Sequence, residues 1–80
     1  MNGHNGQYEH LLRKAREAKR GGHDFWAVQS TGEKVAVAIV LNRSDWLTEM
    51  DYTIAEAIGR TGKEWVAFIP QIARQLSEEE

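Results

Sequence analysis

The chain has 80 residues, of which 41% are hydrophobic and 28% charged, and it contains no cysteine. This is the composition of an ordinary globular protein, and the length predicts one domain over residues 1–80, with flexible ends at 1–6 and 78–80. Without cysteine the chain can form neither a disulfide framework nor a thiolate metal site. Its apolar runs fall far short of the roughly 18 residues of a membrane span, so we expect a cytoplasmic protein.

The charge is divided unevenly along the chain. The formal net charge is −2, but residues 1–23 hold five basic and two acidic side chains (+3), whereas residues 24–80 hold five basic and ten acidic ones (−5). Two parts of opposite charge either face different partners or face each other.

The segment QYEHLLRKAREAKRGG, residues 7–22, has the period of an amphipathic helix, and Gly21 and Gly22 supply its stop. Its apolar positions are Tyr8, Leu11, Leu12, Ala15 and Ala18. On the outer side, Arg13, Arg16 and Arg20 fall within one stripe. This basic stripe is either a solvated face or a basic docking surface for a partner.

Residues of high β propensity crowd both sides of the short segment STGEK, residues 30–34. We therefore predict strands at about 24–30 and 34–41, joined as a hairpin. The second strand is apolar on both faces, so we expect it to be central in a sheet that is covered on both sides.

Residues 44–59 return to a helical period. Ser44 is a candidate cap, and Thr53 with Glu56 forms a second possible capping box, so the segment forms one helix or two with a bend near Asp51. In a single helix, the buried face would consist of Leu47, Met50, Ile54, Ala57 and Ile58. The acidic side chains would form a ridge almost opposite that face, with tryptophan on its shoulder: Asp45, Glu49, Glu56 and Trp46. The ridge is either a solvated side or a binding surface, and Trp46 is either an interface anchor or a core residue with its indole N–H pointing out.

Five consecutive apolar residues, 65–69, lie between Gly62 and Pro70. Because proline suits the first turn of a helix and disfavours helix in the residue before it, we predict a strand at 64–69 and a helix at 70–77. The predicted fold is α+β, a single small domain in the order α-β-β-α-β-α, with a three-stranded sheet packed with helices.

The segment YTIAEAIGRTGKEWVAF, residues 52–68, resembles the helix-turn-helix family, because small, apolar, glycine and apolar residues stand at the positions of that motif: Ala55, Ile58, Gly59 and Trp65. The resemblance implies a small DNA-binding regulator. Two features oppose it: Arg60 stands where the family usually buries an apolar residue, and Gly62 with Pro70 makes a poor second helix. The expected recognition segment also has one basic residue, Lys63, which gives little phosphate neutralisation. The string GRTGK lacks the spacing of a phosphate-binding loop.

We expect no enzyme activity, no cofactor and no metal site. The histidines at 4, 10 and 23 lack metal-ligand spacing, and none of the serines lies in a nucleophile elbow. Carboxylates such as Asp45 and Glu49 are placed on an exposed helix face, without the burial that general acid–base catalysis uses.

The leading hypothesis is a non-enzymatic protein-binding module that blocks or modulates a larger partner complex. In size, charge and lack of motifs the chain resembles the anti-CRISPR inhibitors of phages and mobile elements, a resemblance that covers no alignable segment. It implies nucleic-acid mimicry, in which the acidic ridge and Trp46 occupy a basic nucleic-acid-binding surface of the partner. The alternatives are a DNA-binding regulator that uses residues 53–68 or the basic stripe, and an accessory or antitoxin-type subunit. Direct nucleic-acid binding is the less favoured interpretation, and we expect neither a membrane nor a small-molecule substrate.

Overall fold

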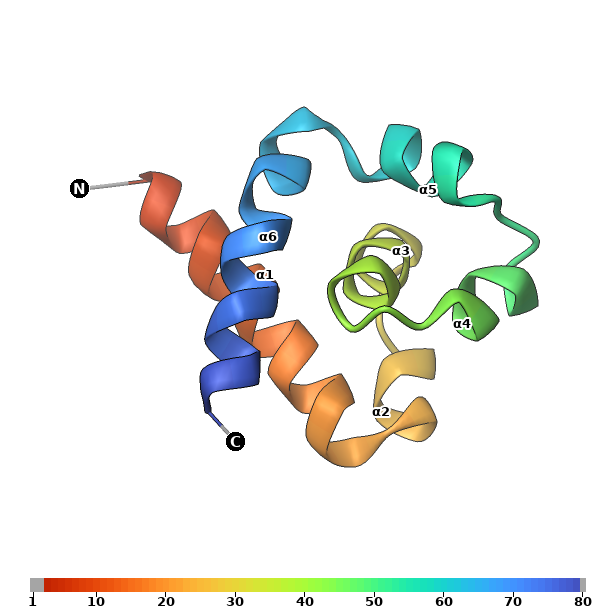
Figure 1. Ribbon diagram of the computed structural model, residues 1–80, viewed down its shortest axis with the longest axis horizontal. Helices are drawn as coiled ribbons and strands as arrows, with labels where there is room; N and C mark the ends of the chain where they lie inside the picture. Colours follow the sequence, from red (N-terminus) through yellow and green to blue (C-terminus); the bar gives the residue numbers. More distant parts are fainter. Residues whose placement is uncertain (1–2, 80) are drawn as a thin grey trace.

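The computed structural model describes residues 3–79, and every regular element within them is an α-helix (Figure 1). These are α1 (Gly3–Gly21), α2 (His23–Ala27), α3 (Thr31–Val40), α4 (Ser44–Glu49), α5 (Ile54–Thr61) and α6 (Lys63–Glu78). The predicted α+β fold with a three-stranded sheet is therefore wrong. The flexible ends expected at 1–6 and 78–80 lie partly outside the described residues; within them, residues 3–6 belong to α1 and residue 78 ends α6.

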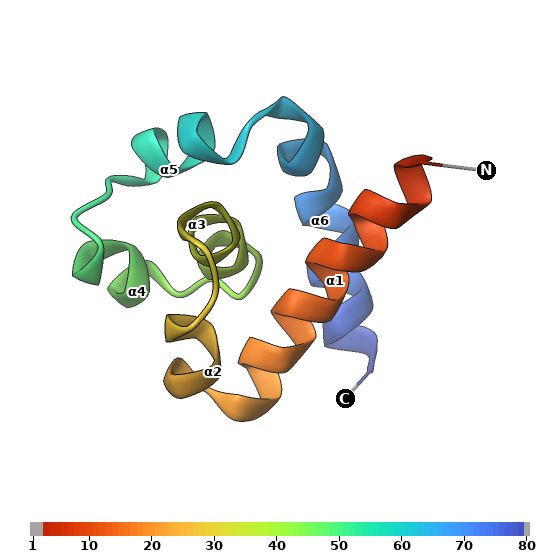
Figure 2. The same cartoon turned by 180° about the vertical axis from the view of Figure 1, so that it is seen from behind.

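Helix α3 forms the centre of the molecule, and all five other helices contact it (Figures 1 and 2). Five of its ten residues are buried, and they lie on more than one face: Val35, Ala36, Val37, Ala38 and Val40. A helix that is apolar all round is stable only when other elements cover it on all sides. Residues 34–41 were predicted to form a central strand. Most of this segment is buried, as expected for a central element, but it forms a helix.

Helix α3 begins at a capping box that was interpreted as a hairpin turn. The Ser30 hydroxyl accepts a hydrogen bond from the Glu33 backbone N–H at 3.3 Å, and the Glu33 carboxylate accepts one from the Ser30 N–H at 3.0 Å. These two bonds satisfy backbone donors that a helix N-terminus leaves free. The predicted hairpin over 24–41 is wrong because Ser30 and Glu33 start a helix, and the preceding segment forms the short helix α2.

The predicted strand at 64–69 is also wrong, because these residues lie inside α6, which continues through Pro70. A proline within a helix removes one backbone hydrogen bond, a cost of about 3 kcal/mol or more in isolation. Burial on one face of α6 opposes this cost: Ile72 and Leu76 are buried, and Trp65, Phe68 and Ile69 pack against the core. Pro70 itself is exposed and displaces no core residue.

The first helix is confirmed. Leu11, Leu12, Ala15 and Ala18 are buried, as their spacing predicts, and the chain turns at Gly22, whose φ of 76° favours glycine. Helix α1 packs on α6, and side-chain hydrogen bonds join the two along their length. The Trp65 indole N–H donates to Gln7 Oε1 at 3.2 Å, and the Tyr8 hydroxyl donates to Gln75 Oε1 at 3.0 Å. Lys19 Nζ donates to the Leu76 carbonyl at 2.7 Å, near the end of α6.

Residues 44–59 form two helices. Asp51, between α4 and α5, has a φ of 64°, a left-handed conformation that aspartate adopts more readily than most residues. Thr53 then caps α5 in the predicted capping box with Glu56. The acidic residues expected on one helix are thus divided between two.

Candidate functional site

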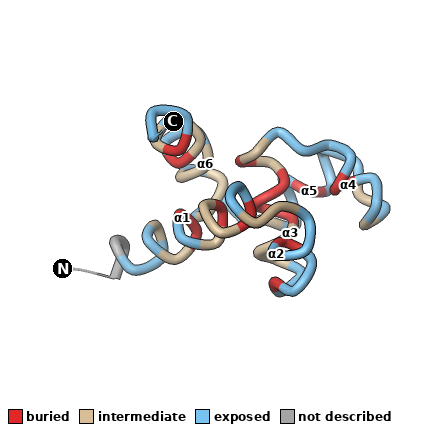
Figure 3. Tube along the Cα trace, turned by 90° about the horizontal axis from the view of Figure 1, so that it is seen from below, coloured by how far each residue is buried: buried red, intermediate tan, exposed pale blue. Residues whose placement is uncertain are grey.

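Helix α5 has an apolar side, and most of that side faces solvent. Ile54 is 61% exposed and Ile58 is 46% exposed, and Ala55 and Gly59 are exposed as well. Within α5, Ala57 alone is buried (Figure 3). The buried face predicted for residues 44–59 is therefore wrong at Ile54 and Ile58. Of its other members, Leu47 and Ala57 are buried and Met50 packs partly buried against the core.

The arrangement follows from how α5 packs on α3. Ala57 and the neighbouring Thr61 point inward, and their small side chains let the two helices approach closely. At 100° per residue, Ile54 and Ile58 then lie along one flank of α5, and Ala55 and Gly59 lie on its outer crest. We call these four residues the α5 face. No charged side chain belongs to it.

A shallow hollow adjoins the α5 face at Ile54. It has a volume of about 120 Å³ and lies between the end of α3 and the start of α4. Its apolar walls come from Ala38, Ile39, Leu47 and Ile54, and its polar edge comes from Asn42, Arg43 and Ser44. The hollow extends the apolar surface of α5 across to α3 and α4.

The members of the expected acidic ridge each have a local partner. Asp45 accepts two hydrogen bonds from Arg43, at 2.9 and 3.1 Å, and these lower the pKa of its carboxyl. Glu49 lies 2.9 Å from His23 Nε2. Glu56 closes the capping box, and its hydrogen bond with the Thr53 backbone lowers its pKa. These carboxylates are exposed, but they do not form one continuous ridge on one helix.

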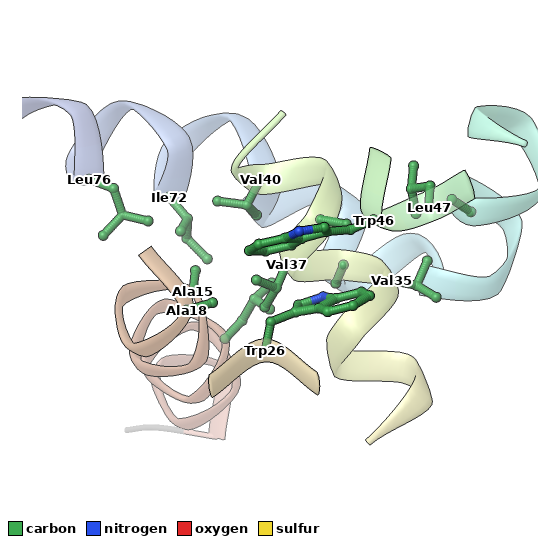
Figure 4. Packing of buried hydrophobic residues seen from close by; sticks show 14 of the residues in the cluster. Ala15, Ala18, Trp26, Val35, Val37, Val40, Trp46, Leu47, Ile72 and Leu76 are labelled. Carbon is green, nitrogen blue, oxygen red and sulfur yellow. The ribbon is translucent and has the colours of Figure 1, made fainter. Parts of the chain in front are cut away.

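Trp46, expected on the shoulder of that ridge, lies in the core. It is 3% exposed and stacks on Trp26, with ring centroids 4.7 Å apart (Figure 4). The Trp26 indole N–H donates to the Lys34 carbonyl at 2.8 Å, and the Arg43 guanidinium lies 4.3 Å from the Trp46 ring centre. The stack joins α2 to α4 beside α3, so Trp46 is a packing residue.

The basic stripe of α1 is partly engaged by the end of α6. Arg16 donates to both carboxylate oxygens of Glu79, at 3.1 and 2.5 Å, and this contact lowers the pKa of Glu79. Arg20 adds a weaker attraction to the same carboxylate. Arg13 lies 3.2 Å from His10 Nδ1. These contacts explain the stripe in large part as the electrostatic link between the basic α1 and the acidic end of α6.

The structure agrees with the helix-turn-helix resemblance in having a second helix and differs from it in the turn. Residues 63–69 are helical, so the objection that Gly62 and Pro70 prevent a second helix is wrong. The turn, however, is the single residue Gly62, with a φ of 90°, and Gly59 lies inside α5. The motif uses a turn of three or four residues. Lys63 and Glu64 stand side by side at the start of α6, so the second helix begins with no net charge for phosphate.

Two histidines make contacts between helices. His10 Nε2 in α1 lies 2.6 Å from Glu33 Oε2 in α3, and His23 in α2 reaches Glu49 in α4. Among residues 3–79, no three His, Asp or Glu side chains come close enough together to hold a metal ion. Within the same residues, no helix is both long and apolar enough to span a bilayer. The compartment stays a prediction.

Comparison with protein-family models, curated proteins and solved structures finds no match to this chain. Its function is therefore inferred from its own geometry and charge.

Proposed function

We propose that this chain is a non-enzymatic protein-binding module that occupies a surface of a larger partner through the α5 face. The observation that carries this proposal is the exposure of Ile54 and Ile58 on a helix whose inner side buries only Ala57. A surface helix of a globular protein normally buries its apolar side chains against the core. Large apolar side chains left exposed together on one helix are typical of a contact surface.

The expected energetic contribution is that of a small hot spot. Ile54 and Ile58 are 61% and 46% exposed, so a partner that covers both removes about one isoleucine side chain of apolar surface from water. Such burial contributes about 1.5–3 kcal/mol. The crest residues Ala55 and Gly59 add little area, but they let a partner approach the helix backbone closely. The hollow beside Ile54 gives that partner a place to insert one side chain.

The other polar features of the chain support a structural rather than a catalytic use. His10 and His23 each contact a glutamate of another helix, and Arg16 contacts the end of α6. The two most buried tryptophans stack on each other in the core. Each of these groups joins two helices, and none of them borders the α5 face.

The test compares four forms of the tagged chain in a lysate of the source cell, with and without nuclease: wild type, Ile54→Asp, Ile58→Gln and Val28→Asp. Ile54 is the first residue of α5, where aspartate is compatible with the helix dipole, so the first variant is expected to fold. Val28, which directly follows α2, is 84% exposed and provides a control with a similar change of charge and apolarity. Ile58→Gln is a second, uncharged variant of the α5 face.

We expect wild type and Val28→Asp to retain the same stoichiometric partner protein, and Ile54→Asp and Ile58→Gln to lose it. With the purified partner, the dissociation constant should rise about tenfold or more for the two α5 variants. Circular dichroism checks that all forms are equally helical. Equal retention by all four forms would refute the α5 face as the contact surface. Retention that disappears with nuclease would instead favour DNA binding.

A further inference from the structure

The segment that carries the α5 face is acidic. Residues 44–59 contain four carboxylates, Asp45, Glu49, Asp51 and Glu56, and no lysine or arginine. With Arg43 and Arg60 at the two ends included, residues 43–60 carry four negative and two positive charges, a net charge of −2. We infer that the α5 face binds a basic amphipathic helix of another protein, an inference that rests on the proposed function and specifies its partner.

Two of these carboxylates are available to a cation from outside. Asp51 and Glu56 border a common surface hollow of about 320 Å³ with Tyr52 and Arg60. Within residues 3–79 neither carboxylate forms an ion pair; Glu56 accepts a hydrogen bond from the Thr53 N–H through Oε1. Arg60 is the one cation in this hollow, and its guanidinium extends over Gly32 at the start of α3. Asp45 and Glu49, in contrast, already contact Arg43 and His23.

The shape of the α5 face suits a helix. Ile54 and Ile58 are one turn apart, and the crest beside them carries only the small residues Ala55 and Gly59, so a second helix can approach the backbone of α5 closely there. An amphipathic helix binds such a surface with apolar side chains at positions i, i+3 or i+4, and i+7. At 100° per residue, Glu56 lies across the Ala55–Gly59 crest from Ile54 and Ile58. Lysines or arginines on the side of the partner helix away from the isoleucines would then extend toward Glu56 and Asp51, so one partner element supplies both apolar and charged contacts.

A second copy of this chain fits the α5 face poorly. Self-association through α5 would bring two acidic segments together, and like charges across an interface weaken binding. Nucleic acid is opposed by the same charge, because phosphate would be repelled by Asp51 and Glu56.

The experiment uses three fluorescent synthetic peptides of about two heptads that share one leucine face and differ in the other residues: lysine, glutamine or glutamate. Fluorescence anisotropy measures their binding to wild type, Ile54→Asp, Ile58→Gln and Val28→Asp at low and moderate salt. We expect the lysine peptide to bind tightest and the glutamate peptide weakest. Ile54→Asp makes the chain more acidic, so non-specific charge attraction predicts tighter binding of the lysine peptide, whereas docking on the α5 face predicts weaker binding.

A charge-neutralised variant, Asp51→Asn with Glu56→Gln, isolates the electrostatic contribution. Asparagine tolerates the positive φ at position 51, and glutamine keeps the capping box at position 56. We expect its affinity for the lysine peptide to fall roughly two- to tenfold, with a weaker dependence on salt. Its affinity for the glutamine peptide should not change.

The outcomes separate this inference from the proposed function. If the glutamine peptide binds as tightly as the lysine peptide, and both lose affinity in Ile54→Asp, the basic character of the partner is wrong but the α5 face remains a contact surface. If the lysate partner depends on Ile54 but the lysine peptide does not bind, a basic helix is the wrong occupant. If wild type sediments as a dimer and Ile54→Asp as a monomer, the occupant is a second copy. If Ile54→Asp changes neither the binding of the peptides nor the retention of the lysate partner, both proposals are wrong.

Discussion

The position of Trp46 decides whether this side chain serves packing or partner binding, and Trp46→Leu distinguishes the two. In the structure, Trp46 is 3% exposed, stacks on Trp26 at 4.7 Å and carries the Arg43 guanidinium on its ring. Leucine keeps an apolar side chain at this position. It removes the stacked ring, however, and leaves space between α2 and α4.

The expected loss of stability is large for a chain of this size. Truncation of a buried tryptophan to alanine typically costs about 3–5 kcal/mol, of which leucine recovers part. Loss of the aromatic stack adds about 0.5–1.5 kcal/mol. We therefore expect Trp46→Leu to lower the free energy of unfolding by about 3 kcal/mol, from a total of roughly 4–12 kcal/mol for 80 residues. The melting temperature should fall by about 12–24 °C.

Urea unfolding, followed by circular dichroism, measures this change. Arg43→Met is the matched control, because it removes the cation over the ring and leaves the two indoles stacked; its effect should be much smaller. Partner affinity, measured where Trp46→Leu is still folded, should stay within about twofold of wild type. An unchanged unfolding free energy together with lost partner binding would show that Trp46 is a surface anchor, and the packing role would be refuted.

Three further predictions concern local structure. Ser30→Ala removes the capping box of α3 and should lower the unfolding free energy by about 1 kcal/mol, whereas Ser30→Asp should restore most of it; the urea midpoint measures both. Gly62→Ala should cost about 1–3 kcal/mol because φ is 90° there, whereas Gly59→Ala, inside α5 with nothing within 4 Å of the new Cβ, should be neutral or stabilising by thermal unfolding. Burial alone would raise the pKa of Glu33, but the hydrogen bonds from His10 and Ser30 outweigh it and hold that pKa below its ordinary 4.5. A carboxyl whose pKa is lowered in the folded state stabilises the fold above its unfolded pKa, and this contribution is lost as the pH falls through the folded pKa. His10→Ala should therefore reduce the free energy of unfolding at pH 6 and make its decrease below about pH 4.5 less steep. Urea titrations at several pH values measure both effects. An unchanged acid profile in His10→Ala would contradict this role for the His10–Glu33 contact.

The sequence predicted well where a helix is amphipathic and ends at glycine. Leu11, Leu12, Ala15 and Ala18 recur at helical spacing, and Gly22 ends α1 as expected. Thr53 and Glu56 also form the capping box that their spacing indicates. In both places, the local signal and the tertiary packing agree, so one sequence is enough.

The prediction failed where apolar residues are continuous. Val35–Val40 is apolar on every face, and a continuous apolar run of this length does not distinguish a central strand from a central helix. The β-branched side chains favour a strand, but the close packing of five helices around α3 outweighs that weak preference. The spacing of Ser30 and Glu33 was the available signal for a helix start. For α6, the presence of Pro70 led to a predicted strand before it, although the helical pattern continues from Trp65 through Ile72 to Leu76.

The α5 face could not be found from periodicity, because periodicity shows that a helix has an apolar side but not where that side points. Ile54 and Ile58 were assigned to the core by the usual rule that apolar sides face inward. In the folded chain the fully buried Ala57 marks the side of α5 that packs on α3, and the two isoleucines lie on the flank beside it. A larger residue at 57 has no free space to occupy, so it would push α5 away from α3. The packing that stabilises the core thus also leaves Ile54 and Ile58 on the surface, where a partner can cover them.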